Sequence, residues 1–296
     1  MPELPEVETV RIGLNQLVPG KVVARVDTDY PKGFPNAASD VQAFLIGATI
    51  VQVRRRAKVL IIDLSTQYSL VIHLKMTGQL VFRSDHERFG AGHPNNSLIG
   101  ELPDKTTRVT LTFMDGSRLF FNDQRKFGWV RLLPTAEIEQ LDFFQKVGPE
   151  PLADDFTAEQ FMVCLRRRKG SGMKAVLLDQ TIVAGIGNIY ADEGLWAAKI
   201  HPLAKVADVP EAQLRELYSA LVTVLRLSIE KGGSTDRNYV DAKGQRGSYL
   251  TFANVFRREG KPCPRCSTTI IKTRVAGRGT HTCPHCQVLV NPLLDK

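Results

Sequence analysis

The sequence predicts an α+β protein of several domains: an N-terminal β-sandwich that carries a helix at its start, a helical region, and a small cysteine module. Three observations support this fold class. Residues 21 to about 133 read as short strands separated by turn residues, the apolar period becomes helical after residues 148–151, and two Cys-x-x-Cys pairs lie near the C-terminus. A chain of 296 residues is long enough for two domains that each bury a core.

The first expected element is a helix near the N-terminus. Pro5 suits the first helical position, Glu6 and Glu8 complement the positive end of the helix dipole, and Pro19-Gly20 ends the run. The apolar residues fall on one stripe: Val7, Val10, Leu14, Leu17 and Val18. Taken alone, this opening favours an ordinary acidic helix start.

A sandwich or flattened barrel is expected next, because many short strands alternate with turn signals. Residues 108–113 alternate cleanly, and Asp115-Gly116 predicts a hairpin into residues 118–122. Residues 85–104 are rich in glycine and proline, so we expect a long surface loop there. The charge run 54–56 is expected to be a solvated face.

Helices are expected beyond a short helix at 137–147 and the linker-like Gly148-Pro149-Glu150-Pro151. Thr157 and Gln160 form a capping-box pattern. Further helical stretches are expected at 173–180, at 188–198, and from Pro210 to Gly232. The predicted domains are therefore a sandwich at 1–135, a linker at 136–152, a helical domain at 153–256 and a cysteine module at 257–296.

Composition points to a polyanionic partner. Lysine and arginine number 39 against 31 acidic residues, which gives a net charge of +8 and a pI near 9.3. Nucleic acid is the foremost candidate, although ribosomal and membrane-surface proteins share this bias. There is no apolar run of about 18 residues and no signal-like segment, so we expect a cytoplasmic protein that does not enter a membrane.

The cysteine module is the strongest local signal. Four cysteines have the spacing of a structural zinc site: Cys263, Cys266, Cys283 and Cys286. Four thiolates leave no open coordination position, so one zinc ion would hold shape and perform no chemistry. Between the pairs we expect a β-hairpin with Arg278 at its tip, and we expect Cys164 to be an inert buried thiol.

The opening Met-Pro-Glu-Leu-Pro-Glu-Val-Glu-Thr resembles the start of the bacterial formamidopyrimidine-DNA glycosylases, which excise oxidised purines from DNA. Residues 183–193 resemble the helix–two-turns–helix signature of the same family. The resemblance covers nearly the whole chain, and its motifs follow the family's order. It implies a monomeric enzyme of base excision repair that acts on double-stranded DNA containing an oxidised base.

The resemblance also implies a mechanism. Removal of Met1 would leave Pro2 with a secondary amine, and a free α-amino group titrates near ~8. This amine would attack the sugar of the lesion nucleotide, Glu3 would protonate the ring oxygen, and β and δ eliminations would follow from the imine. No catalytic metal and no nucleotide cofactor are implied.

The family's other functional residues carry over by motif position. Lys58 and Arg278 match residues that act at the phosphates of the extruded nucleotide. The remaining matches are to DNA-binding residues (His73, Met76, Arg125, Phe127, Asn188 and Lys231) and to residues around the lesion (Glu6, Ser234 and Thr235). Among the DNA-binding residues, Met76, Arg125 and Phe127 match a trio that fills the gap left in the base stack.

Two positions depart from the family pattern. Lys105-Thr106-Thr107 lacks a histidine that is usual there, and Phe256 replaces a tyrosine. Two rival functions remain: a pyrimidine-lesion glycosylase of the endonuclease VIII type, and a non-catalytic zinc-containing DNA-binding protein. Leu4, Val7 and the 232–249 segment argue against the first rival, and the N-terminal Pro2–Glu3 pair argues against the second.

Overall fold

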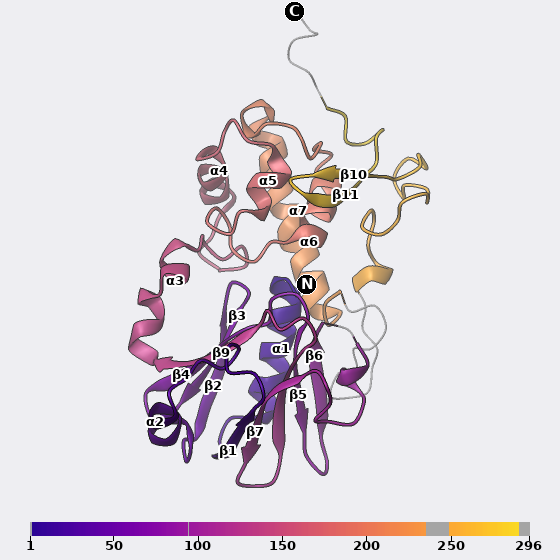
Figure 1. Ribbon diagram of the computed structural model, residues 1–296. Helices are drawn as coiled ribbons and strands as arrows, with labels where there is room; N and C mark the ends of the chain where they lie inside the picture. Colours follow the sequence, from indigo (N-terminus) through magenta and orange to yellow (C-terminus); the bar gives the residue numbers. More distant parts are fainter. Residues whose placement is uncertain (1, 94, 235–248, 290–296) are drawn as a thin grey trace, which may run out of the picture. The chain divides into compact units, whose positions relative to one another are not determined.

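The computed structural model describes residues 2–93, 95–234 and 249–289 (Figure 1). The chain divides into two compact units. One unit contains Met1–Gln145 and Ser228–Tyr249, and the other contains Lys146–Leu227 and Leu250–Lys296. The domain boundaries predicted above remain a prediction, since this division follows contacts rather than sequence motifs.

The N-terminal unit is a sandwich of two antiparallel sheets, which confirms the predicted fold class. One sheet has five strands in the order β1-β7-β8-β5-β6, and the other has four in the order β2-β3-β4-β9. The strands of the first sheet are β1 (Val23–Thr28), β7 (Thr107–Phe113), β8 (Arg118–Asp123), β5 (Gly78–Arg83) and β6 (Arg88–Gly92). Those of the second are β2 (Ile50–Arg56), β3 (Val59–Leu64), β4 (Tyr68–His73) and β9 (Trp129–Pro134).

Side-chain alternation explains why the two sheets pack. Strand β7 buries Val109, Leu111 and Phe113, as its period of two predicts. Strand β3 is buried throughout because both of its faces are covered. Leu60 and Ile62 join the core between the sheets, whereas Val59 and Ile61 pack with Ile138 and Phe144 on the other face.

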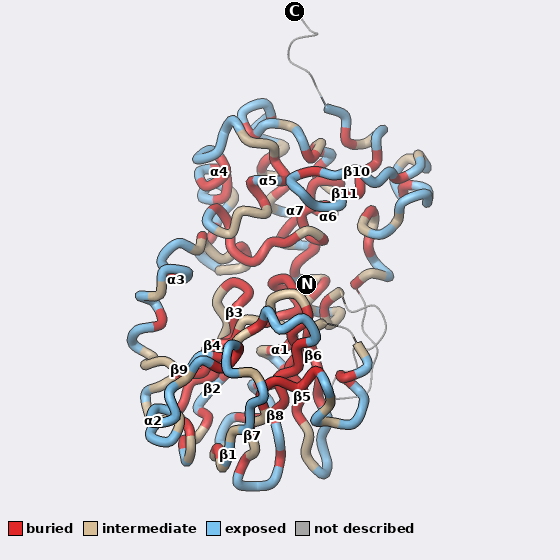
Figure 2. The backbone as a smooth tube through the Cα atoms, in the orientation of Figure 1, coloured by how far each residue is buried: buried red, intermediate tan, exposed pale blue. Residues whose placement is uncertain are grey.

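Helix α1 (Leu4–Leu17) contacts β2 and β6, which are edge strands of different sheets (Figure 1). Its predicted stripe is buried at Val7, Val10 and Leu14, so the helix closes one side of the core (Figure 2). Gly13 permits this close approach, because a Cβ there would lie 2.1 Å from the Phe89 ring.

Three sequence expectations need correction. The 85–104 stretch is not one long loop: it contains β6 and a 3₁₀ turn at Asn96–Leu98. The charge run at 54–56 is the end of β2, where Arg54 and Arg55 pair with Asp63 and Glu8. The helix expected at 137–147 is two short pieces, a 3₁₀ helix at Thr135–Gln140 and α3 at Asp142–Lys146.

The second unit is helical, with helices at the predicted places. They are α4 (Ala158–Arg166), α5 (Met173–Leu178), α6 (Asn188–Ala197) and α7 (Glu211–Glu230), of which residues 228–230 belong to the first unit. Thr157 and Gln160 form the predicted capping box of α4. Gly194 lets α6 approach α7, since a Cβ there would lie 2.6 Å from Leu221.

A two-stranded hairpin completes this unit, with β10 at Ile271–Val275 and β11 at Arg278–Thr282. Its turn consists of Ala276 and Gly277, both with left-handed backbone (φ +48° and +72°). The remaining short elements among the described residues are α2 (Ala38–Asp40), a π-helical turn at Val41–Leu45, and 3₁₀ turns at Val206–Asp208 and Tyr249–Thr251.

Candidate active site and nucleic-acid interface

Pro2 lies directly before a buried helix cap. Glu3 is the N-cap residue of α1 and forms a capping box with Glu6, in which each side chain accepts from the other's backbone N–H. The Glu3 N–H donates to Glu6 Oε2 at 2.8 Å. The two glutamates are only 2% and 5% exposed. The capping box was not predicted, although the Glu-x-x-Glu spacing of Glu3 and Glu6 is compatible with one.

Glu6 also holds the chain that follows α7. The Ser234 N–H donates to Glu6 Oε1 at 2.7 Å. Gly233 has a left-handed backbone (φ +88°), and a Cβ there would lie 3.2 Å from the Glu6 side chain. Lys231 pairs with Glu230 at 2.7 Å, and Thr235 lies outside the described residues. Of the residues expected around the lesion, Glu6 and Ser234 are therefore in direct contact.

Lys58 is the second residue of the two-residue turn between β2 and β3. Ala57 has a left-handed backbone (φ +53°), and Arg55 Nη1 donates to the Ala57 carbonyl at 2.7 Å. Arg55 also pairs with Glu8 of α1 at 2.8 Å. The turn that carries Lys58, which is 8% exposed, is thus tied to the helix that begins at the Pro2–Glu3 end.

His73 lies opposite Val59 in the β3–β4 register, one residue from Lys58. Burial, with the ammonium groups of Lys75 and Lys58 nearby, lowers the pKa of His73 to about 3. The Lys75 N–H donates to His73 Nδ1 at 3.0 Å. The ring is therefore neutral at pH 7 and carries its proton on Nε2, where it can donate to an anion.

Met76, Arg125 and Phe127 lie together although they come from two loops. Arg125 Nη1 donates to Met76 Sδ at 3.1 Å, and the Arg125 guanidinium lies 4.7 Å from the centre of the Phe127 ring. Phe127 is 50% exposed. An exposed aromatic ring beside an arginine and a methionine can enter a base stack.

A hydrogen bond joins the start of α6 to β11, whose first residue is Arg278, one position after the Ala276-Gly277 turn and not at the tip as expected. Gly185 adopts φ +80°, and its N–H donates to Gln180 Oε1 at 2.9 Å. Asn188 Nδ2 donates to the Gly279 carbonyl at 3.0 Å, next to Arg278. Gly187, the N-cap of α6, has no side chain that could cap the helix, so the helix start suits an anion.

The four cysteines of the predicted zinc site come together, with their sulfur atoms all within 4.8 Å of one another. The Trp196 indole N–H donates to Cys263 Sγ at 3.4 Å. Hydrogen bonds from the Thr268 hydroxyl and amide lower the pKa of Cys266, whereas burial raises the pKa of Cys283 and Cys286, so without a metal ion the four thiols do not all ionise readily. This donor set fits one tetrahedral structural zinc ion.

Sequence reasoning missed a buried ion pair that anchors the hairpin. Lys174 of α5 and Asp192 of α6 are fully buried, and their charged atoms lie 2.6 Å apart. Lys174 Nζ also donates to Thr280 Oγ1 at 2.7 Å, and the His281 N–H donates to Asp192 Oδ2 at 2.9 Å. Charged residues on an otherwise apolar helix face were the only signal in the sequence.

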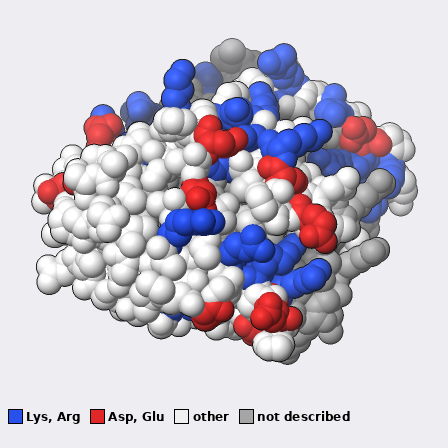
Figure 3. All heavy atoms as spheres, turned by 60° about the horizontal axis from the view of Figure 1, so that its bottom comes forward, with Lys and Arg blue, Asp and Glu red and all other residues white. Residues whose placement is uncertain are grey.

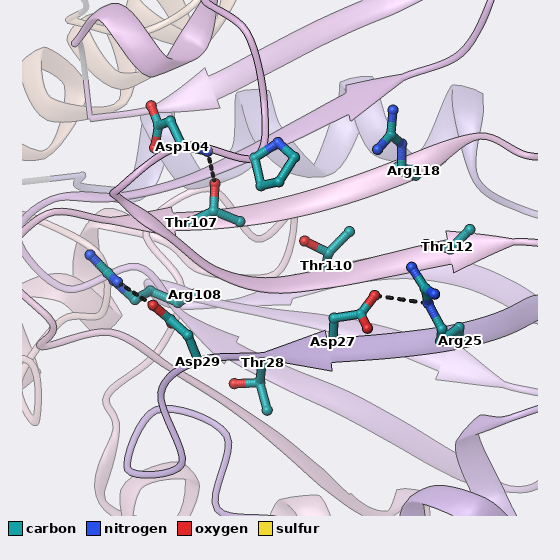
Figure 4. Close-up of a pocket in the computed structure, with 11 residues that line it drawn as sticks. Arg25, Asp27, Thr28, Asp29, Asp104, Thr107, Arg108, Thr110, Thr112 and Arg118 are labelled. Atoms are coloured by element: carbon teal, nitrogen blue, oxygen red, sulfur yellow. Dashed lines mark hydrogen bonds and ion pairs between the residues drawn. The ribbon is translucent and has the colours of Figure 1, made fainter.

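A separate depression of about 470 Å³ lies over β1, β7 and β8 (Figure 4). In Figure 4 Asp27 points toward Arg25, and Asp29 toward Arg108. Basic and acidic side chains are likewise interleaved on the face drawn in Figure 3, beside a broad uncharged area. The internal ion pairs leave this depression without a net charge that would select an anion.

Among the described helices, none combines the length and the apolar character that crossing a membrane requires.

Comparisons with known proteins agree with this arrangement. The family model of the formamidopyrimidine-DNA glycosylase N-terminal domain matches residues 1–130, that of the glycosylase's helix–two-turns–helix domain matches 147–239, and a zinc finger found in FPG and IleRS matches 260–288. A formamidopyrimidine-DNA glycosylase of Pediococcus pentosaceus is 43% identical over 98% of this chain and 100% of its own length.

Solved structures of Lactococcus lactis Fpg are similar throughout. A mutant of that protein in complex with DNA containing Fapy-dG has a TM-score of 0.85 and 34% identity, covering 97% of this chain and 100% of its own. The wild-type protein in complex with DNA containing an oxidised pyrimidine has a TM-score of 0.83, with the same identity and coverage.

A sandwich with a proline at position 2, a helix–two-turns–helix and a four-cysteine finger together define a zinc-containing DNA glycosylase, an enzyme of DNA repair. The chain belongs to the formamidopyrimidine-DNA glycosylase family.

Proposed function

We propose that the protein removes oxidised purines from double-stranded DNA and then cleaves the strand at the abasic site. The observation that carries this proposal is the start of α1, where Pro2 precedes two buried carboxylates that share a capping box. In a buried site of this kind, the amine can act as the nucleophile, and the neighbouring carboxyl group can donate and accept protons in turn.

The reaction follows from these groups once Met1 is removed. The neutral Pro2 nitrogen attacks C1′ of the lesion nucleotide, and the oxidised base departs with the electrons of the glycosidic bond. The attached nitrogen passes its proton by way of Glu3 to the sugar ring oxygen, the bond between C1′ and that oxygen breaks as the ring opens, and an iminium ion forms between Pro2 and C1′. β and δ eliminations then expel the 3′ and 5′ phosphates.

The other predicted residues bind the DNA or the lesion. Lys58, neutral His73, Asn188 and Arg278 contact phosphates, and Met76, Arg125 and Phe127 occupy the gap left by the extruded nucleotide. Glu6, Ser234 and Thr235 contact the lesion, and Lys231 contacts DNA beside them. One zinc ion on Cys263, Cys266, Cys283 and Cys286 holds the Arg278 hairpin in shape and takes no part in the chemistry.

The proposal also covers the state and place of the enzyme. It acts as a monomer on DNA in the cytoplasm. Oxidised pyrimidines are a second substrate class, because Lactococcus lactis Fpg has been crystallised with DNA that contains one.

Borohydride trapping tests the mechanism. Purified protein is incubated with a duplex that contains 8-oxoguanine opposite cytosine, and borohydride is added to reduce any imine to a permanent crosslink. We expect a trapped complex with the wild type, whose loss of Met1 is verified by mass spectrometry. Glu3→Gln should lower its yield at least about 100-fold, since it removes the carboxyl group that transfers the proton. Pro2→Gly should also lower the yield, because it replaces the fixed secondary amine by a mobile primary amine.

Glu216→Gln is the matched control, because it makes the same chemical change at an exposed carboxylate of α7. Crosslinking by both Pro2→Gly and Glu3→Gln at the wild-type level would overturn the mechanism. A second duplex with an oxidised pyrimidine separates the two substrate classes, because trapping on that duplex alone would assign the enzyme to the rival class.

A further inference from the structure

The two loops that carry Met76, Arg125 and Phe127 share an unusual backbone. Lys75, directly before Met76, has φ +50°, and Lys126, directly before Phe127, has φ +58°. Residues with a Cβ rarely adopt this left-handed conformation, and they keep it only where surrounding contacts fix it. Both apolar residues therefore follow a backbone turn that the rest of the fold must hold.

Asp123, at the end of β8, supplies those contacts in one of the loops. It is fully buried, and its Oδ2 accepts the Phe127 N–H at 2.8 Å and the Gly128 N–H at 2.6 Å. Its Oδ1 accepts the Arg125 N–H at 3.2 Å. One carboxylate thus ties three backbone groups of the loop to the end of a strand.

The same carboxylate reaches the other loop through Thr77. The Thr77 hydroxyl donates to Asp123 Oδ1 and accepts the Arg125 N–H at 2.9 Å. Thr77 is buried, directly follows Met76, and precedes Gly78, which pairs with Asp123 in the β5–β8 register. Asp123 and Thr77 are therefore buried residues that connect the Met76 loop to the loop of Arg125 and Phe127 through hydrogen bonds.

The outer side of the second loop is braced as well. The Tyr30 hydroxyl donates to the Lys126 carbonyl at 2.8 Å, and Lys126 Nζ lies 5.5 Å from the centre of the Tyr30 ring. Gly128 leaves room for the turn, since a Cβ there would lie 2.6 Å from Phe121 and 2.9 Å from the His73 carbonyl. The loop is fixed on both sides by groups of the sandwich itself.

We infer that Asp123 and Thr77 are positioning residues that keep Met76, Arg125 and Phe127 at a fixed spacing before DNA arrives. The inference rests on the proposed function, in which these three side chains fill the gap in the base stack. Side chains that are already held in place lose little conformational freedom when they enter the base stack. Asp123 and Thr77 therefore act on the step in which the base leaves the duplex, and not on bond breaking at C1′.

Thr77 offers a matched pair of variants. Thr77→Val keeps the side-chain shape and removes the hydroxyl, whereas Thr77→Ser keeps the hydroxyl. The readouts are the single-turnover rate of base excision from a lesion duplex and of strand cleavage on a duplex with a preformed abasic site, where no base has to be extruded. A 2-aminopurine next to the lesion reports unstacking directly through its fluorescence.

We expect Thr77→Val to lower the excision rate and the fluorescence-detected unstacking rate about tenfold, equivalent to about 1.4 kcal/mol of barrier. Its cleavage of the abasic-site duplex should stay within about twofold of wild type, and Thr77→Ser should retain both activities. Asp123→Asn should show the same selective loss, since its single amide oxygen cannot serve both the Arg125 N–H and the N–H groups of Phe127 and Gly128.

Two results would overturn the inference: Thr77→Val that matches Thr77→Ser on both duplexes, or Thr77→Val that loses equally on both duplexes, which would indicate a general structural role. Melting temperatures of both Thr77 variants identify a loss that follows from unfolding. A wild-type enzyme inactive on both duplexes would instead count against the proposed function, so the two failures are distinguishable.

Discussion

Two arginines that we assign to DNA contacts are held in different ways. The loop of Arg125 is fixed by Asp123, a buried carboxylate that binds backbone N–H groups of its own unit. The hairpin of Arg278 has a metal site at its base and the Lys174–Asp192 ion pair beside Thr280 and His281 of β11. The first arrangement needs only the polypeptide, whereas the second needs a zinc ion and a buried charge pair. Loss of zinc and mutation of the ion pair should therefore affect the Arg278 hairpin and leave the Arg125 loop unchanged.

Removal of zinc should give the largest difference. Structural zinc contributes about 10–16 kcal/mol to folding in small zinc modules, so chelation or Cys266→Ser should unfold the hairpin. We expect affinity for lesion DNA to fall at least about 100-fold, because the Arg278 contact and its neighbours are lost. Filter binding and metal analysis measure the two quantities.

Cys164→Ala is the matched control, because Cys164 is a buried cysteine outside the four-sulfur cluster. It should keep the zinc content and the affinity of the wild type. Undiminished binding after verified loss of zinc would show that the Arg278 hairpin needs no metal.

Lys174→Met should have the next largest effect. Removing one partner of a buried ion pair leaves the other charge uncompensated, which typically destabilises a protein by about 3–5 kcal/mol. We expect a loss of this size in denaturant unfolding, together with weaker DNA binding at unchanged zinc content. The Asp123 loop lies in the other unit and should keep its role in base extrusion.

Lys169→Met serves as the control, since Lys169 is an exposed lysine in the same unit. Equal unfolding midpoints for Lys174→Met and Lys169→Met would mean that the buried pair does not stabilise the hairpin region.

His73 should give a smaller effect that depends on pH. Its folded pKa of about 3 lies below the ~6.5 of an unfolded histidine, so the unfolded state takes up a proton first as the pH falls. The stability linked to the neutral ring is present above pH ~6.5 and is lost as the pH falls toward the folded value, at up to about 1.4 kcal/mol per pH unit. Between pH 6.5 and 5, His73→Gln should remove up to about 2 kcal/mol of this decline.

Denaturant unfolding at several pH values measures this dependence, and the exposed His86→Gln is the control. An identical pH dependence in the wild type and in His73→Gln would contradict the low folded pKa.

Local patterns in the sequence predicted much of the fold. The stripe of α1, the alternation in β7, the capping box at Thr157 and the cysteine spacing each depend on neighbours a few residues apart. The glycines of 85–104 suggested a loop, but β6 forms there because it pairs with β5. This pairing outweighs the weak preference of glycine for strands.

The features that were missed depend on contacts between distant residues. Arg55 pairs with Glu8 across 47 positions, and Lys174 reaches Thr280 across 106. The periodicity of the sequence does not reveal such pairs. From the sequence alone, a charged residue at any of these positions could equally well be exposed to solvent. The candidate site was predicted by family motifs, and its supporting contacts, such as those of Asp123, emerged only from the fold.

Glu6 is constrained because both oxygen atoms of its carboxylate accept a hydrogen bond. One carboxylate oxygen accepts the Glu3 N–H and the other accepts the Ser234 N–H. Glutamine has the same shape but only one accepting atom, and aspartate is shorter by a methylene, so neither near-neutral exchange can satisfy both partners. Each of these two exchanges should therefore leave one of the two backbone N–H groups without its acceptor and loosen the contact between the start of α1 and Ser234.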